Sequence, residues 1–217
     1  MGSIKRSFAN NLSTGGVFTS SAIANSSVTG ITTLANAPAD GITLISSQTA
    51  SSSATISFTT GIDSTYKAYK FVFSNIRPAT DSVQFTFNMS TDSGSNYNVT
   101  KTSTHFYAFH DEADTDTALT YDINLDLAQS TSFQPITRTQ GNGADESCSG
   151  TLTIFNPAST TYVKHFISNV NSYYQANYTF NQYVAGYGNT TSAINALQFK
   201  MDSGNIADGK IYLYGIK

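Results

Sequence analysis

Features that stabilise or target many small domains are scarce in this sequence. Its 217 residues include one cysteine, Cys148, four prolines and no tryptophan. A single cysteine cannot form an intrachain disulfide, so a hydrophobic core or association with other chains has to stabilise the protein. No stretch is apolar over the length that a membrane span requires. The start, MGSIKRSF, has no apolar run after its basic residues, so we expect no signal peptide and synthesis in the cytoplasm.

Charged side chains are also scarce. They make up 12% of the residues, against about 25% in ordinary soluble domains. The formal net charge is -3, and the sequence has no cluster of Lys and Arg of the kind that binds nucleic acid or an anionic membrane. We therefore expect neither nucleic acid nor a membrane among the partners. Ser, Thr, Asn and Gly replace the charged residues and predict a surface that is polar but nearly uncharged.

The clearest pattern lies between residues 66 and 90, where large apolar residues alternate with small or polar ones. Tyr69, Phe71 and Phe73 share one parity. The next run repeats the pattern with Val83, Phe85, Phe87 and Met89. Because successive side chains of a strand point to opposite faces, each run predicts a half-buried strand, with residues such as Thr86 and Asn88 on the polar side. Two strands are only marginally stable in water, so their apolar face needs a second sheet.

Further short runs of this kind supply that second sheet. They are bounded by Gly, Asn, Asp or Ser and lie at residues 42–47, 54–60, 97–102, 105–110, 133–139, 148–155, 162–169, 178–187, 193–201 and 210–216. Roughly ten to twelve strands at such spacings, with no convincing helical period, are typical of a sandwich or barrel. We therefore predict an all-β fold for residues 41–217, an antiparallel two-sheet β-sandwich of jelly-roll type.

The first 40 residues have a different pattern. Apolar residues occur singly, with neither helical nor strand spacing, and include Phe8, Leu12, Val17, Phe18 and Ile23. Two interpretations stay open, a disordered leader and an extended arm whose apolar residues contact another subunit and order only on assembly. We assign residues 1–40 to an extended N-terminal attachment arm, with these five residues as its candidate anchors.

Residues 111–127 interrupt the strand pattern and contain many of the acidic residues, which predicts a long acidic loop. Glu112, Asp114 and Asp116 alternate next to His110 and loosely resemble a calcium loop. Calcium requires six or more oxygen ligands around a sharp glycine turn, and this segment has no glycine. We therefore favour a solvated loop over a calcium site, and we expect no bound metal or cofactor.

Catalytic motifs are absent from the sequence. The three histidines, His105, His110 and His165, lie inside strand-like runs. The chain has no nucleophile elbow, phosphate loop, HExxH motif or paired cysteines. Serine is so abundant that the presence of a serine, a histidine and an aspartate in one chain is no evidence for a catalytic triad. We therefore expect that the protein is not an enzyme.

Tyrosines gather near the C-terminal third of the chain and form the remaining candidate site. Its members are Tyr174, Tyr178, Tyr183 and Tyr187. Aromatic faces beside Asn and Gln can stack on sugars, but the chain lacks tryptophan, the side chain with the largest stacking surface. The alternative is that these tyrosines pack across strands or against a neighbouring subunit, and this is the interpretation that we prefer.

Several long phrases of the sequence resemble a known family. These are SATISFTTGIDSTYKAYKFVFSNIRPATDSVQFTFNMSTDSGSNYNVTKT, NPASTTYVKHFISN, GYGNTTSAINALQFKMDSGNI and GKIYLYGIK. They resemble a β-rich domain of structural proteins in tailed bacteriophages, especially phages of cyanobacteria and other marine bacteria. The likeness covers residues 41–217. In that family the domain looks like the exposed end of a tail fibre or a stand-alone virion surface protein.

The resemblance implies a virion structural protein, which either decorates the capsid as a cement protein or caps a short tail fibre. It implies attachment through the N-terminal arm, other virion proteins as partners, a homotrimer and a place on the virion surface after synthesis in the host cytoplasm. The alternative is a receptor-binding carbohydrate-recognition module that contacts a host surface glycan. A polysaccharide-degrading enzyme would need paired carboxylates, and the acidic segment lacks the apolar surroundings that raise the pKa of one of them.

Overall fold

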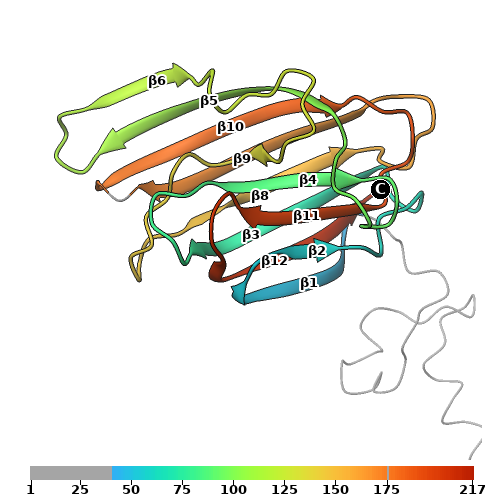
Figure 1. The fold of residues 1–217 in the computed structure, drawn as a ribbon, viewed down its shortest axis with the longest axis horizontal. Helices are drawn as coiled ribbons and strands as arrows, with labels where there is room; N and C mark the ends of the chain where they lie inside the picture. The colour runs from blue at the N-terminus through green and yellow to red at the C-terminus, as the bar shows by residue number, and fades with distance from the viewer. Residues whose placement is uncertain (1–40, 175) are drawn as a thin grey trace, which may run out of the picture. The chain divides into compact units, whose positions relative to one another are not determined.

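The computed structural model describes residues 41–174 and 176–217. This part of the chain folds into two antiparallel sheets that pack face to face (Figure 1). The prediction of an all-β, two-sheet sandwich is therefore confirmed. No helix in these ranges is long and apolar enough to cross a membrane. The predicted N-terminal arm and its candidate anchors lie outside the described residues.

The two sheets differ in width. The strands are β1 (Ile42–Ser53), β2 (Ile56–Phe58), β3 (Ala68–Pro78), β4 (Phe85–Ser90), β5 (Lys101–Asp111), β6 (Thr117–Tyr121), β7 (Gln134–Pro135), β8 (Cys148–Phe155), β9 (Lys164–Tyr174), β10 (Tyr178–Gly188), β11 (Ala196–Met201) and β12 (Ile206–Ile216). The larger sheet has eight strands in the order β1-β12-β3-β8-β9-β10-β5-β6, and the smaller sheet has four in the order β2-β11-β4-β7. In Figure 1 the smaller sheet lies in front of β3, β8 and β12, while β5 and β6 lie beyond its margin.

Phenylalanine rings fill the space between the sheets. Phe71 and Phe73 of β3 face Phe85 of β4 and Phe199 of β11, and all four are fully or almost fully buried. The ring of Phe199 lies 5.1 Å from that of Phe71 and 5.3 Å from that of Phe73, measured between centroids. The two alternating runs that the sequence shows between residues 66 and 90 therefore do not pair with one another. They belong to opposite sheets, and their apolar faces form the core.

Strand β4 is buried on both faces, not half-buried as its alternation predicts. Thr86 and Asn88 are at most 2% exposed. The segment that follows β4 and the segment that precedes β7 lie at this second face. The Asn88 side chain hydrogen-bonds to both segments. Its Nδ2 donates hydrogen bonds to the carbonyl oxygens of Tyr97 (2.7 Å) and Thr131 (2.9 Å). Burial of a polar residue is tolerated here because its side chain is hydrogen-bonded.

The acidic segment is not a loop throughout. Strand β6 lies within it and pairs with β5, from His110 opposite Thr117 to Phe106 opposite Tyr121. The carboxylate of Asp111 accepts hydrogen bonds from the backbone N–H groups of Thr115 (2.8 Å) and Asp116, which stabilises the turn before β6. The prediction of one long acidic loop was wrong for residues 117–121, because these five residues carry no charge and the acids belong to the turns around them.

The inner face of the larger sheet extends past the smaller sheet, and the connection between β6 and β8 covers it there. Arg138 in this connection lies over the rings of Tyr107 in β5 (4.5 Å) and Phe180 in β10 (5.4 Å). Its backbone N–H and its guanidinium donate to Gln182 Oε1 and to the Tyr107 hydroxyl. This end of the sandwich is therefore closed by one irregular segment instead of a sheet.

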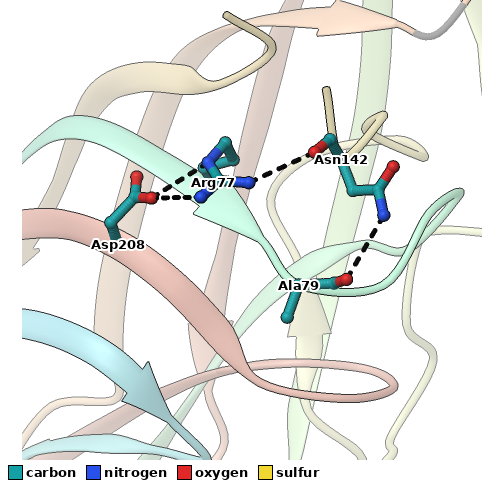
Figure 2. Close-up of polar contacts among 4 residues, drawn as sticks. All are labelled: Arg77, Ala79, Asn142 and Asp208. Atoms are coloured by element: carbon teal, nitrogen blue, oxygen red, sulfur yellow. Dashed lines mark hydrogen bonds and ion pairs between the residues drawn. The ribbon is translucent and has the colours of Figure 1, made fainter. Parts of the chain in front are cut away.

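A polar contact network joins the same connection to the ends of two strands (Figure 2). The Arg77 guanidinium at the end of β3 donates through Nε to Asp208 Oδ2 (2.9 Å) of β12 and through Nη1 to the Asn142 carbonyl (3.2 Å). Asn142 Nδ2 in turn donates to the Ala79 carbonyl (3.3 Å). Because Asp208 is exposed, its ion pair with Arg77 contributes about 1 kcal/mol at most. The contacts fix the position of the connection more than they stabilise the fold.

Candidate binding surface on the larger sheet

The outer face of β9, β10, β5 and β6 points away from the smaller sheet and is the candidate binding surface. Buried and exposed residues alternate along β9 and β10, so one face of these strands packs in the core and the other meets solvent. The residues with outward parity are Thr102, Thr104, Phe106, Ala108, His110, Thr117, Leu119, Tyr121, His165, Ile167, Asn169, Asn171, Tyr173, Thr179, Asn181, Tyr183, Ala185 and Tyr187. None of them is Asp, Glu, Lys or Arg.

One side of this face is apolar. Phe106 of β5 lies opposite Tyr183 of β10, and their rings stack with centroids 5.1 Å apart and planes inclined by 10°. Tyr121 of β6 lies opposite Phe106 on its other side. Leu119 of β6 is 73% exposed, and Ile123, just after this strand, is 76% exposed. These five residues are called the apolar strip below, and exposed strips of this kind mark contact surfaces.

Next to the strip, the outer face is hollowed at Ala185. Tyr187 of β10 lies opposite His165 of β9, with ring centroids 6.2 Å apart and planes inclined by 65°. Between these rings and Tyr183, β10 carries only the small Ala185, which leaves a shallow hollow of about 510 Å³. Thr102, Thr104 and Ile167 are among the residues that line it. This hollow is called the Ala185 depression, and its size falls in the range of small-molecule sites, about 300–1,000 Å³.

Gly186 lets the two strands under the depression approach closely. A Cβ atom at Gly186 would lie 2.4 Å from the carbonyl oxygen of Thr102 and 2.8 Å from the Cα of Ser103. Both of these atoms belong to the backbone of β5, so a side chain at this position would push β5 away from β10. The glycine therefore fixes the spacing of the strands that carry Thr104 and Ala185.

Side-chain amides form a hydrogen-bonded row on the same outer face, outside the lining of the depression. Asn169 Nδ2 donates to Asn181 Oδ1 (3.0 Å), and Asn171 Nδ2 donates to Thr179 Oγ1 (2.8 Å). Asn181 Nδ2 in turn donates to the Tyr183 hydroxyl (3.2 Å). These contacts hold a row of neutral donors and acceptors next to an aromatic ring. Such a surface recognises hydroxyl groups better than charged groups.

The structure divides the four candidate tyrosines into two groups. Tyr183 and Tyr187 lie on the outer face, where Tyr187 lines the depression and Tyr183 stacks on Phe106 in the apolar strip. Tyr174 and Tyr178 have the opposite parity and lie on the inner face, where both rings contact Phe180 at centroid distances of 5.5 Å and 6.0 Å. This second pair is half-buried in an aromatic cluster at the end of the sandwich. The two groups therefore cannot contact the same partner surface.

Other members of the surface were missed in the sequence. Phe106 lies between His105 and Tyr107, so aromatic residues occur at successive positions and the parity of β5 cannot be assigned from the pattern. His165 and Asn169 come next to Tyr187 and Tyr183 only through the pairing of β9 with β10. This register could have been predicted by assuming a regular hairpin in which Tyr174 pairs with Tyr178. Counting back along the two strands then pairs each tyrosine of β10 with one residue of β9.

The acidic segment and the cysteine serve the fold. Among residues 41–174 and 176–217 no group of three or more His, Cys, Asp or Glu side chains could hold a metal ion. Hydrogen bonds from Thr115 lower the pKa of the Asp111 carboxyl to about 2. Asp116 Oδ2 accepts a hydrogen bond from the Tyr178 hydroxyl (3.3 Å). Burial raises the pKa of the Cys148 thiol to about 12, so this thiol is not a nucleophile at neutral pH.

His105 is buried on the inner face of β5, and neither ring nitrogen has a hydrogen-bond partner. Burial lowers its pKa to about 4. The charges of Asp122 and Asp126 act in the opposite direction, and Arg138 adds to the lowering. The folded protein therefore holds a neutral imidazole in the pH range where the unfolded chain takes up a proton, since the ordinary pKa is about 6.5.

We expect the free energy of unfolding to fall by up to about 3 kcal/mol as the pH drops from 6.5 to 4, because only the unfolded His105 is then protonated. In His105→Leu this decrease should disappear. Urea unfolding of both proteins, followed by circular dichroism in steps across this window, measures the difference. The decrease below pH 4, where hydrogen-bonded carboxyls such as Asp92 and Asp111 titrate, should remain in both. Parallel curves between pH 4 and 6.5 would contradict the assignment.

Comparisons of the chain with protein-family models, with curated proteins and with solved structures find no match. The functional assignment therefore depends on the surface described above and on the resemblance in the sequence.

Proposed function

We propose that this protein is a structural protein on the surface of a bacteriophage particle, either a capsid decoration protein or part of a short tail fibre. It works as a homotrimer, attached to other virion proteins through residues 1–40. The apolar strip is the observation that carries the proposal, together with the resemblance over residues 41–217. A face with Leu119 and Ile123 about three-quarters exposed is suited to contact with another protein.

Strand β6 supports an assembly role because it is an unprotected edge. It ends the order of the larger sheet, and its sequence, TALTY, contains no lysine, proline or acidic residue. Proteins usually protect exposed edges with such residues or with bulges. The opposite edge strand, β1, has an irregularity between Leu44 and Ser46 and is rich in serine. The edge at β6 is therefore the one that we expect a neighbouring protein to cover.

The core agrees with a particle component that has to persist outside a cell. The chain has a single, buried cysteine, so no intrachain disulfide contributes to its stability. Stability comes instead from closely packed aromatic rings between two sheets. The low charge of the candidate surface also avoids self-repulsion between copies that are held close together in an assembly.

Quantitative mass spectrometry of purified phage particles tests the proposal. We expect the protein at a fixed copy number relative to the major capsid protein. A number on the scale of the capsid lattice identifies a decoration protein, and a number comparable with that of the tail proteins identifies a fibre component. Absence from particles that are free of cell debris would overturn the proposal.

Incorporation into particles should depend on the apolar strip. We expect Leu119→Lys to reduce the number of copies per particle at least ten-fold, a loss of about 1.4 kcal/mol or more in binding, because a charge replaces an apolar contact. The matched control is Ile42→Lys, which introduces the same charge at an apolar residue of the opposite edge strand, β1. The Ile42 side chain is 60% exposed. Equal incorporation of both variants would show that the strip is not the contact surface.

A second function is favoured by a separate observation. The Ala185 depression is lined by the aromatic side chains of Tyr187 and His165 and by the hydroxyl groups of Thr102 and Thr104, and a carbohydrate-recognition module uses such stacking and hydrogen-bonding groups. The same protein would then display a receptor-binding surface on the particle. The strip and the depression are different parts of the outer face, so the two functions do not compete for the same residues.

A further inference from the structure

We propose that β6 pairs antiparallel with β6 of a second copy of this chain, in the register that places Leu119 opposite Leu119 of the other copy. The inference rests on the assembly role proposed above for this edge. It adds the identity of the neighbour and the geometry of the contact. The pairing joins the larger sheets of two copies into one continuous sheet, because β6 is the last strand of each.

The hydrogen bonds between β6 and β5 show which backbone groups of β6 are free. The N–H of Asp122 donates to the His105 carbonyl (2.9 Å) at one end of the pair. The N–H of Asp111 donates to the Asp116 carbonyl (3.1 Å) at the other end. In an antiparallel pair such positions alternate with positions whose N–H and C=O groups point away. The odd-numbered residues of β6 therefore direct these groups away from β5, and no other described segment pairs with them. They are Thr117, Leu119 and Tyr121.

The sequence TALTY is suited to pair with itself. With Leu119 on the two-fold axis, every residue of the strand has a partner, and Thr117 lies opposite Tyr121 of the other copy. Pairs of an aromatic and a β-branched residue stabilise antiparallel strands. These side chains lie on the outer face, so the apolar strips of the two copies become neighbours. On the inner face, the small Ala118 and Thr120 leave room for the two backbones to approach.

The charges around β6 also favour a second copy as the neighbour. A two-fold contact requires a patch that is complementary to itself, and five uncharged residues meet without like charges. Beyond the strand, Asp116 of one copy would face Asp122 of the other. The Arg138 side chain forms an ion pair with Asp122 (3.6 Å) and offsets part of this repulsion. The acids therefore end the pairing at residues 117 and 121 and fix its register.

A single contact of this kind is weak. A pair of five-residue strands is a small interface, below the roughly 1,000 Å² that a stable association needs. A homotrimer has no two-fold axis, so the contact joins copies that belong to different trimers. Many weak contacts repeated among trimers hold a layer together without any new interaction. The pairing therefore suits a layer of copies on a capsid better than the tip of a fibre.

Disulfide trapping in the full-length protein tests the register. In Leu119→Cys the two introduced thiols lie on paired residues, with Cα atoms about 5.5 Å apart, a distance that a disulfide spans. The matched control is Thr117→Cys, whose thiol faces Tyr121 and lies about 13 Å or more from the other introduced thiol. The natural Cys148 is buried. With oxidised glutathione as the oxidant, we expect Leu119→Cys to form covalent dimers at least about ten-fold faster than Thr117→Cys.

A proline at the centre of the contact tests the backbone pairing. Leu119→Pro removes an N–H that points away from β5, so no hydrogen bond within the chain is lost. In sedimentation velocity over a range of protein concentrations, we expect Leu119→Pro to associate at least about ten-fold more weakly than the unchanged protein. Leu119→Val is the control, because it keeps the N–H and an apolar side chain. It should associate as the unchanged protein does.

Three results would overturn the inference: equal crosslinking of the two cysteine variants, no covalent dimer in either, or unchanged association of Leu119→Pro. Unchanged circular dichroism of the variants shows that each effect is local. These outcomes are independent of the copy number in particles. A protein that is abundant in virions and does not crosslink through residue 119 keeps the structural function and loses this contact.

Discussion

Replacing Phe199 with alanine should lower the free energy of unfolding by about 4 kcal/mol, within the range of about 3–5 kcal/mol for buried phenylalanines. The side chain is fully buried in β11 and contacts five other rings, those of Phe58, Phe71, Phe73, Phe85 and Phe87. Removing it loses the transfer of a large apolar group and leaves a cavity that rigid neighbours on both sheets cannot fill. The edge-to-face contacts with Phe71 and Phe73 are lost as well.

Urea unfolding followed by far-ultraviolet circular dichroism measures the loss for Phe199→Ala. Phe155→Ala is the matched control, because Phe155 belongs to the larger sheet but is 42% exposed. We expect the control to lose less than about 1 kcal/mol. If Phe199→Ala and Phe155→Ala lost the same amount, the rings around Phe199 would not be the centre of the core.

Replacing Asn88 with leucine should lower the free energy of unfolding by about 3–5 kcal/mol, the cost of leaving a buried charge and other polar groups without a partner. Asn88 Oδ1 accepts hydrogen bonds from Lys101 Nζ (2.6 Å) and from the Met89 backbone N–H (2.8 Å). Its Nδ2 joins the segments that contain Tyr97 and Thr131. After the substitution, Lys101 Nζ keeps its hydrogen bond to the Val99 carbonyl (2.8 Å).

Asn171→Leu is the control for this position, since its amide lies on the exposed outer face and pairs with Thr179. The double variant Asn88→Leu, Lys101→Met should recover part of the stability, because both polar partners are then gone. A double variant as unstable as the sum of the two single ones would show that the two side chains do not interact.

The pKa of Lys101 predicts the pH at which the interaction between Lys101 and Asn88 weakens. Burial lowers the pKa of Lys101 to about 7, whereas the unfolded chain keeps the ordinary value of 10.5. Between these values only the unfolded state binds the proton, so this group makes the protein more stable as the pH rises from 7 to 10.5. The increase should be present in the unchanged protein and absent from Lys101→Met. The destabilisation by Asn88→Leu should shrink as the pH rises to about 7, where folded Lys101 loses its charge, and stay constant above that.

The strand pattern of the core was readable in the sequence because side-chain parity is a local property. Alternation identifies Phe71 and Phe73, and also Phe85 and Phe87, as buried faces of strands. Which strands pair is not local, and the runs at β3 and β4 belong to different sheets although they follow each other in the chain. The burial of Asn88 depends on segments that fold over β4 from both sides. The periodic pattern of apolar residues in β4 does not show which other segments will cover the strand.

The candidate surface could be predicted only in part for the same reason. Tyr183 and Tyr187 share parity, which the sequence shows, and this separates them from Tyr174 and Tyr178. The stacking of Phe106 on Tyr183 depends on the register between β5 and β10, which are far apart in the chain. Strand β6 was hidden because its five uncharged residues are surrounded by acids that favour turns.

The unequal width of the two sheets should divide the molecule into a slowly and a rapidly exchanging half. Amide protons of β3 and β12 lie under the aromatic core and should exchange with deuterium only when the whole chain unfolds. On the inner face, β5 is covered by a single irregular segment that Arg138 attaches to the sheet, and β6 is the edge strand beside it. Lifting that segment requires much less free energy, so this margin of the sandwich can adapt its shape to a neighbour while the core stays closed.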